Sequence, residues 1–185
     1  MQKTKIVLDA DVIIHFAKGE RLSMLPEIFK EYEYIILDKV HNEIHEPIRR
    51  QLDNQISLLK NISIHKFEPR GEMLKEYAKL TQSLGKGESA CMVYCRFNND
   101  VVGSSNLKDI VQYCTTHKIT YITTIDFLYY AIKKALITIE EAKEFIKEVK
   151  SKDSKLPEID FSTYLPTSWL RSEEHTSELQ SHHDL

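Results

Sequence analysis

The chain has 185 residues, of which 42% are hydrophobic and 29% are charged, values typical of one globular domain with a substantial core. No run of about 18 apolar residues occurs, so we expect no membrane span. The formal net charge is −3, a near balance that excludes a protein binding nucleic acid through overall charge alone.

The last fifteen residues, 171–185, resemble over their whole length the translation of a common sequencing-library adapter with its index. We interpret them as an artefact and leave them out of the fold prediction, so His182-His183 is not taken as a metal site. The segment holds one basic and four acidic residues, which leaves residues 1–170 with 24 of each and formally neutral. Any binding of nucleic acid then depends on a local basic patch.

The first part of the chain alternates short β-branched runs with helical periodicity. We expect strands at 4–9 and 33–38, and helices at 11–18 and 22–30. A long helix follows at about 40–60, which Pro47 should kink or split. Residues 62–67 are expected to form a short edge strand.

The second part continues the alternation. The expected elements are helices 72–83 and 88–97, strand 101–105, helix 107–117, strand 119–123, and helices 125–134 and 138–150. We therefore predict an α/β fold of three layers, α/β/α, with a central parallel sheet of four to five strands. Residues 1–150 form the domain, and 151–170 form a C-terminal tail whose aromatic stretch can pack back on it.

Three acidic residues stand where the expected local structure changes. Asp9 ends the first strand, Glu43 lies just inside the helix after the second strand, and Glu88 opens the helix after Gly85-Lys-Gly87. The carboxyl ends of parallel strands share one edge of a sheet, where ligands bind. Because clustered carboxylates repel one another unless a cation neutralises them, these acids predict a divalent-metal site.

Each acid also has a purely structural interpretation. Asp9 or Asp11 can cap the next helix, and we favour function for Asp9 while leaving Asp11 open between capping and function. Glu43 alone is typical of a solvated helix residue, and a first-turn acid such as Glu88 is favoured by the helix dipole.

Two further regions offer a fourth ligand. Asn106 and Asp109 follow the strand 101–105 and are spaced like a capping box, so capping competes there with metal binding. Asp126, after the strand 119–123, can supply another acid, although we favour a helix cap at that position.

Zinc chemistry is disfavoured. Cys91, Cys95 and Cys114 are expected to be small buried hydrophobic residues and not zinc ligands or disulfide partners. His41 and His45 share a helix face, but His-x-Glu-x-His is not the His-Glu-x-x-His arrangement of zinc proteases.

Together these segments resemble the PIN-domain ribonucleases, the fold of many toxin–antitoxin toxins. The resemblance covers about residues 4–130 and rests on short motifs in a shared order: Val7-Leu-Asp9-Ala-Asp11-Val-Ile-Ile, the Glu43 helix start, Gly87-Glu88-Ser-Ala90, and Ser104-Ser-Asn106-Leu-Lys-Asp109. It implies a PIN-like domain that hydrolyses RNA phosphodiester bonds as a metal-dependent endoribonuclease.

The resemblance also implies a set of site residues. Four acids would bind Mg²⁺ or Mn²⁺ and act in catalysis: Asp9, Glu43, Glu88 and Asp109. Asn106 and Asp126 are additional candidates, Asn106 as a neutral oxygen ligand or a substrate contact. The family often has Asp near position 106, so the amide here lowers the expected metal affinity. Candidates for phosphate contacts are Lys86, Lys108, Arg49 and Arg50.

The implied partners are RNA, an antitoxin protein and a second copy of the chain in a homodimer. Because the chain enters a strand by about residue 5, we expect no signal peptide and a cytoplasmic location.

Two other functions compete with this one. Asp9-Ala-Asp11 also resembles the Asp-x-Asp motif of haloacid-dehalogenase-type phosphatases, although the strand 101–105 leads to no acid pair, which that family needs. Alternatively, the chain is a catalytically weakened PIN-like module that binds RNA or protein, an interpretation that Asn106 and the neutral charge favour.

Overall fold

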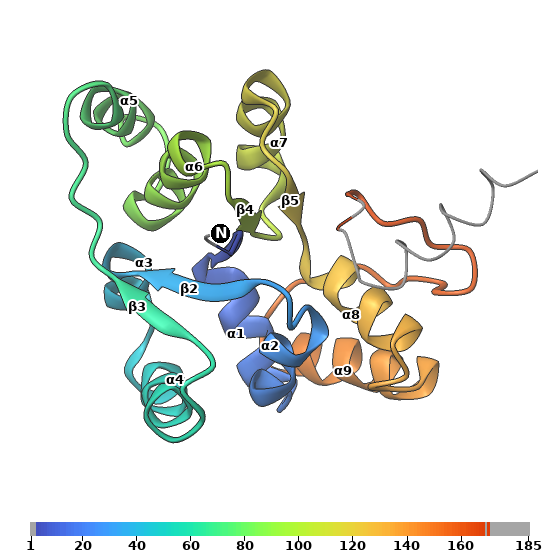
Figure 1. Cartoon of the computed structure of the whole chain (residues 1–185). Coiled ribbons are helices and arrows are strands. Elements are labelled where there is room, and N and C mark those ends of the chain that lie inside the picture. Colours follow the sequence, from blue (N-terminus) through green and yellow to red (C-terminus); the bar gives the residue numbers. More distant parts are fainter. Residues whose placement is uncertain (1–2, 169, 171–185) are drawn as a thin grey trace, which may run out of the picture.

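The computed structural model describes residues 3–168 and 170, so the adapter-like segment lies outside the described residues. Its centre is a five-stranded parallel sheet in the order β3-β2-β1-β4-β5 (Figure 1). The strands are β1 (Lys5–Leu8), β2 (Glu33–Leu37), β3 (Ser63–His65), β4 (Val101–Gly103) and β5 (Tyr121–Ile122). This confirms the predicted parallel α/β sheet.

Helices cover both faces of the sheet. One layer contains α5 (Glu72–Leu80), α6 (Lys86–Asn98) and α7 (Leu107–His117), seen above the sheet in Figure 1. The opposite layer contains α1 (Ala10–Lys18), η1 (Leu22–Met24), α2 (Leu25–Ile28), α4 (Glu46–Leu59) and α9 (Ile139–Ser151). The short α3 (Asp38–Glu43) follows β2, and α8 (Thr124–Lys133) follows β5. Within the described residues, no helix has both the length and the apolar character needed to cross a bilayer.

The strand order places a topological switch point between β1 and β4. The chain proceeds from β1 outward through β2 to β3, then returns to the other side of β1 as β4 and β5. Leu8 is paired with Gly103, so the residues that follow them, Asp9 and Ser104, begin neighbouring loops at the carboxyl ends of the strands. Parallel α/β folds bind ligands at this kind of crevice.

The predicted element boundaries agree closely with the structure. The long helix expected at 40–60 is split into α3 and α4, and α4 begins just before Pro47, which lies where its missing N–H costs nothing. β3 is an edge strand, as expected. Glu43 is the exception, because it ends the short helix α3 and does not begin a helix.

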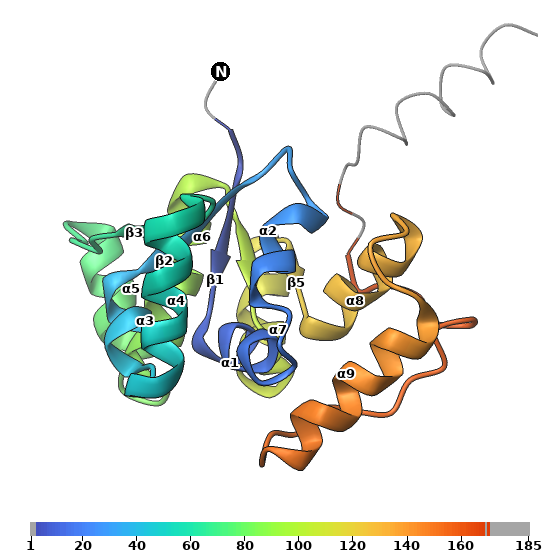
Figure 2. The ribbon, with the colours of Figure 1, turned by 90° about the horizontal axis from the view of Figure 1, so that it is seen from below.

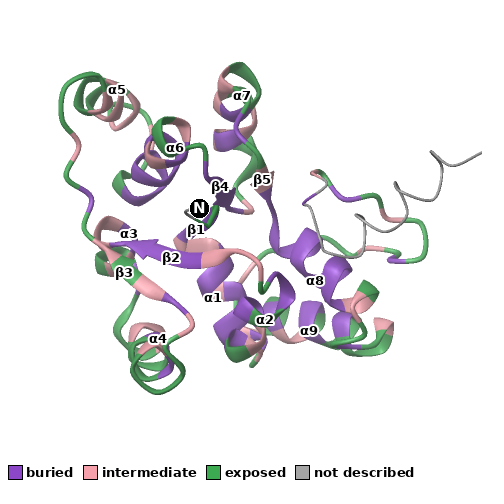
Figure 3. Ribbon diagram, in the orientation of Figure 1, coloured by how far each residue is buried: buried purple, intermediate pink, exposed green. Residues whose placement is uncertain are grey.

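The core follows from the hydrophobic runs. Every residue of β1 is buried, as a central parallel strand covered on both faces requires. Most of the neighbouring strand β2 is buried as well (Figure 3). Large apolar side chains from β1, β2, α1 and α8 form one cluster, in which the Phe16 and Phe127 rings meet edge to face with centroids 5.9 Å apart.

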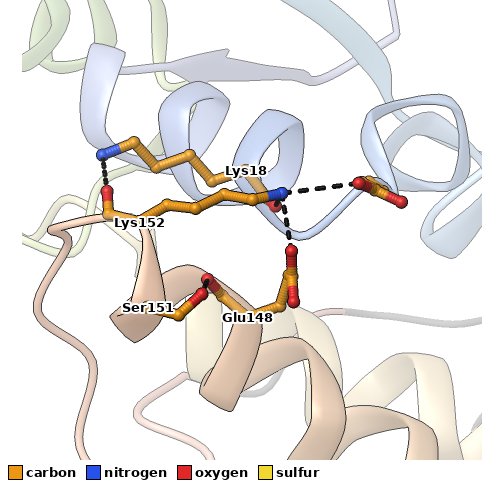
Figure 4. A network of polar contacts seen from close by, with 5 residues as sticks. Lys18, Glu148, Ser151 and Lys152 are labelled. Carbon is orange, nitrogen blue, oxygen red and sulfur yellow. Dashed lines mark hydrogen bonds and ion pairs between the residues drawn. The ribbon is translucent and has the colours of Figure 1, made fainter.

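The C-terminal part of the domain is fastened to α1. Lys152, just after α9, donates to the backbone oxygen of Lys18 and pairs with Glu148 at 2.7 Å, while Lys18 donates back to the backbone oxygen of Lys152 (Figure 4). Further along, Tyr164 donates to Asp126 at 2.7 Å. The described residues of the tail, 151–168 and 170, therefore pack back on the body, as the sequence indicated.

Candidate active site

Asp9 is fixed at the carboxyl end of β1. Its backbone N–H donates to the Gly103 carbonyl at 2.8 Å, and its side chain caps α1 by accepting from the Ala10 amide. The second carboxylate oxygen accepts from the Ser104 hydroxyl at 3.2 Å. Asp9 is therefore the N-cap of α1 and also lies at the carboxyl end of a central strand.

Asp11 joins Asp9 from the first turn of α1. Its Oδ2 atom accepts from the Ser105 amide at 2.8 Å, and Oδ1 accepts from the Val12 amide. Because Asp9 is the N-cap residue, the question left open for Asp11 is answered against capping. The prediction of site residues omitted Asp11, although its place two residues after the strand end was a usable signal.

Glu88 and Asp109 approach the same crevice from α6 and α7. The Asn106 side-chain amide lies between them, donating to Glu88 Oε1 at 2.9 Å and to Asp109 Oδ2 at 2.7 Å. Asn106 occupies the N-cap position of α7, but its side chain makes no capping hydrogen bond. Of the two alternatives left open here, the capping box is not formed, because the Asn106 amide is hydrogen-bonded to the two acids.

One tripeptide supplies donors to four acids. We call Ser104–Asn106 the donor loop, since the Ser104 hydroxyl, the Ser105 backbone amide and the Asn106 side-chain amide reach Asp9, Asp11 and the Glu88–Asp109 pair, respectively. The loop follows β4, at the switch point of the sheet. All of these donors are neutral groups.

Glu43 reaches the site by a different route. Its Oε1 atom accepts a hydrogen bond of 2.9 Å from the Gly87 amide in the first turn of α6, a helix whose own N-cap residue is Gly85 and provides no side-chain cap. Glu43 is therefore a tertiary cap for α6, where the helix dipole favours a negative charge. Its exposed side chain also contributes to the field at Glu88.

Burial, together with neighbouring charges at Asp9 and Glu88, raises the pKa values of several of these acids. Burial raises the pKa of Asp9 well above its usual range, and the charges of Asp11 and Glu88 raise it further. Burial raises the pKa of Asp11 to about 6, against the lowering effect of its backbone hydrogen bonds. Burial and then the charge of Asp109 raise the pKa of Glu88 to about 7. The cluster therefore favours binding either protons or a cation at neutral pH.

A second hydrogen-bonded chain lies behind the donor loop. Ser105 Oγ accepts from the Thr124 amide and donates to Thr124 Oγ1, both at 2.8 Å, and Thr124 Oγ1 shares a 2.8 Å hydrogen bond with Nδ1 of His15. Burial lowers the pKa of His15 to about 4, so this imidazole is neutral at pH 7. Sequence reasoning missed His15 and Thr124; a histidine on the apolar face of its helix was the available signal.

Asp126 lies outside this cluster. Its carboxylate completes a capping box with Thr123 at the start of α8 and accepts hydrogen bonds from the Tyr164 hydroxyl and from the amide and hydroxyl of Thr167. The side chain is fully buried. The favoured interpretation as a cap is confirmed, and the residue also anchors the C-terminal tail.

The cysteines, His41 and His45 were weighed as zinc ligands from the sequence. Cys91, Cys95 and Cys114 are free and buried, which confirms their expected packing role. His41 Nε2 contacts Asp53 Oδ1 at 2.7 Å, whereas His45 is exposed.

The acidic cluster has the donors that a hard divalent cation requires. Carboxylate oxygens are the preferred ligands of Mg²⁺, and their raised pKa values show charge that a cation would offset. Among residues 3–168 and 170, however, no three His, Cys, Asp or Glu side chains are arranged to hold a metal ion. The oxygen chemistry of these carboxylates nevertheless fits the ion.

Basic groups and a groove lie beside the acids. Lys86 and Lys108 are exposed, and neither forms an ion pair within the described part of the chain. Arg50 is instead paired with Glu46. A groove of about 500 Å³ between α5 and α7 begins at Lys108 and Asp109 and continues past Lys79, Tyr113 and His117. We call it the α5–α7 groove.

A family model described as DUF3368, a PIN domain, matches residues 5–165. The chain belongs to the PIN-domain family. PIN domains are generally nucleases and generally use divalent metal ions. The match favours the PIN interpretation over a haloacid-dehalogenase-type phosphatase, in agreement with the Ser104-Ser105 sequence after β4. No curated protein matches this PIN domain significantly.

Proposed function

We propose that this PIN domain is a divalent-metal-dependent endoribonuclease that hydrolyses RNA phosphodiester bonds. The observation that carries the proposal is the meeting of Asp9, Asp11, Glu88 and Asp109 on one donor loop at the switch point of the sheet. Burial raises the pKa values of Asp9, Asp11 and Glu88, and neighbouring carboxylates raise those of Asp9 and Glu88 further, which is typical of functional sites.

Asp9, Glu43, Glu88 and Asp109, together with Asp11, would hold Mg²⁺ or Mn²⁺. When bound, the ion supplies a more acidic water and positive charge beside the phosphodiester. The Gly87 amide, in the first turn of α6, holds the Glu43 carboxylate where its negative charge acts on Glu88. The Ser104 hydroxyl orients the Asp9 carboxylate, and the Ser105 amide does the same for Asp11.

The substrate would approach along the basic margin of the site. Lys86 and Lys108 are free to contact backbone phosphates, and the α5–α7 groove can accommodate part of a single strand next to Asp109. Residues 1–170 are formally neutral, so we expect moderate affinity with a modest dependence on salt.

The test is cleavage of single-stranded RNA in the presence of Mn²⁺ by the wild type and by Asp9→Asn, with Glu140→Gln as the exposed surface control. Cleavage by wild type and control but not by Asp9→Asn supports the proposal. If purified folded protein neither cleaves RNA nor binds Mn²⁺ in calorimetry, the nuclease assignment is overturned.

A second candidate is a catalytically weakened PIN module that binds RNA or a protein partner. It is favoured by the neutral Ser104-Ser105-Asn106 sequence after β4, and by the finding that no three described His, Cys, Asp or Glu side chains form a group that could hold a metal ion. RNA retention on a filter without any cleavage in Mn²⁺ would support this candidate over the enzyme.

A biological role follows from the nuclease proposal. The domain would act as the toxin of a toxin–antitoxin pair, held inactive by a small antitoxin protein and acting as a homodimer. Growth arrest on induction, relieved by coexpression of a small protein encoded next to the gene, supports this role. Normal growth with active nuclease in the cells argues against it, and light scattering gives the oligomeric state.

A further inference from the structure

The Asn106 side-chain amide lies between the carboxylates of Glu88 and Asp109, two of the residues that would hold a divalent cation. Its single amide nitrogen has two N–H groups, and the hydrogen bonds to Glu88 at 2.9 Å and Asp109 at 2.7 Å use both. The orientation of the amide is fixed by charge, because the alternative would point its oxygen at two carboxylates. Asn106 therefore presents a donor to the acids and not an oxygen ligand to an ion.

The Asn106 side chain makes these two hydrogen bonds in place of a helix cap. Asparagine is among the best N-cap residues, and Asn106 stands at the N-cap position of α7, yet its side chain makes no capping hydrogen bond to a backbone amide of the helix. Hydrogen bonds to ionised acceptors are stronger than those to neutral groups, which explains the choice. Asn106 keeps these two hydrogen bonds only while no cation is bound by the Glu88 and Asp109 carboxylates.

We propose that Asn106 is a built-in neutral substitute for a cation, which competes with the metal for Glu88 and Asp109. This inference rests on the proposed metal-dependent function. The Asn106 residue is exposed, so its side chain can rotate away into solvent without disturbing the core. Metal binding then requires that rotation. In the absence of metal, the Asn106 amide stabilises the Glu88 and Asp109 carboxylates.

The proposal fixes the sign of a substitution. If Asn106 competes with the ion, Asn106→Ala removes the competitor and tightens Mn²⁺ binding. If Asn106 were an oxygen ligand, the same change would remove a ligand and weaken binding. We expect about tenfold tighter binding, since the ion no longer displaces two hydrogen bonds to charged groups.

The experiment is Mn²⁺ titration of the full chain by calorimetry, with free Mn²⁺ measured independently by electron paramagnetic resonance. A pH of 8.5 limits competition by protons at Glu88, whose pKa is about 7. The variants are Asn106→Ala and Asn106→Asp. Asn98→Ala is the matched control, because Asn98 lies at the far end of α6 and donates to the Tyr94 carbonyl. Circular dichroism verifies that each variant is folded.

Tighter binding by Asn106→Ala, with the Asn98→Ala value equal to wild type, supports the proposal. Weaker or unchanged binding by Asn106→Ala overturns it, whether or not the protein proves to be a nuclease. Asn106→Asp adds a carboxylate and serves as the test of the site itself. If even Asn106→Asp binds no Mn²⁺, the metal-dependent function fails, and this inference fails with it.

Discussion

The Glu43 carboxylate lies against the backbone of Gly87, with the Gly87 amide donating to Glu43 Oε1 at 2.9 Å. A Cβ atom at Gly87 would lie 2.4 Å from Glu43 Oε2 and 3.2 Å from Cγ2 of Val40. Glycine is needed here for this close approach of α3 to α6. One contact thus both caps a helix and holds an acid of the candidate site.

Gly87→Ala should displace the Glu43 carboxylate without unfolding the domain. Oε2 is the far end of a flexible side chain, so we expect a change of about 1 kcal/mol or less in the free energy of unfolding, partly offset by the better helix propensity of alanine. RNA cleavage should fall about tenfold or more. Both are measured together, by urea unfolding and by initial cleavage rates.

Gly85→Ala is the matched control, because an added Cβ there meets no atom within 4 Å. It should leave cleavage near the wild-type rate. A Gly87→Ala variant that is as active as Gly85→Ala would show that the position of Glu43 does not matter to the reaction.

The raised pKa values predict that these acids oppose folding above neutral pH. Glu88 binds its proton more tightly in the folded state, with a pKa of about 7 against a usual value of 4.5. Its contribution to the free energy of unfolding is therefore most favourable below pH 4.5 and falls as the pH rises to 7. Glu88→Gln should stabilise the fold at pH 8 by an amount on the order of 1 kcal/mol and make little difference at pH 4.

Urea unfolding of the wild type and Glu88→Gln at several pH values measures this difference. Glu140→Gln, at an exposed position on α9, is the control and should show no such pH dependence. A Glu88→Gln variant less stable than wild type at pH 8 would contradict the predicted sign.

His15 should act as a positioning residue through Thr124 and Ser105. His15→Leu removes the hydrogen bond to Thr124, and we expect kcat for RNA cleavage to fall about tenfold with KM little changed, since the donor loop loses its support. His15→Asn can place an amide near the Nδ1 position and should recover most of the loss.

A double-mutant cycle tests the relay itself. His15→Leu and Thr124→Val remove the same hydrogen bond from opposite sides, so their effects on kcat should be strongly non-additive. Additive losses would mean that His15 does not act through Thr124.

Asp126 should matter for stability and not for metal binding. Asp126→Ala leaves the donors of Thr123, Tyr164 and Thr167 without their acceptor and empties a buried position, so the free energy of unfolding should drop by about 2 to 4 kcal/mol. Tyr164→Phe removes only one donor and should cost about 1 kcal/mol. In calorimetry both variants should bind Mn²⁺ with the affinity of the wild type. A weakened affinity in Asp126→Ala alone would place Asp126 in the site.

Several parts of this molecule were predictable because they depend on local pattern. The fully apolar run of β1 and the alternation of strands and helices predicted a parallel sheet with two helical layers, and Pro47 marked the division between α3 and α4. The strand end fixed Asp9, because the residue after a central parallel strand must emerge at the carboxyl edge. These features need no knowledge of which segments meet in space.

Other parts depend on which loops meet across the sheet. The sequence offered Asn106, Asp109 and Asp126 as caps or ligands, with a cap favoured for Asp126, since all three lie near helix starts. Only the fold shows that Asn106 bridges Glu88 and Asp109, that Asp126 faces the tail, and that Asp11 belongs with Asp9. The strand order β3-β2-β1-β4-β5 is not the chain order, and it places β4 beside β1. The donor loop after β4 therefore lies beside Asp9, where its neutral groups can donate hydrogen bonds to the acids.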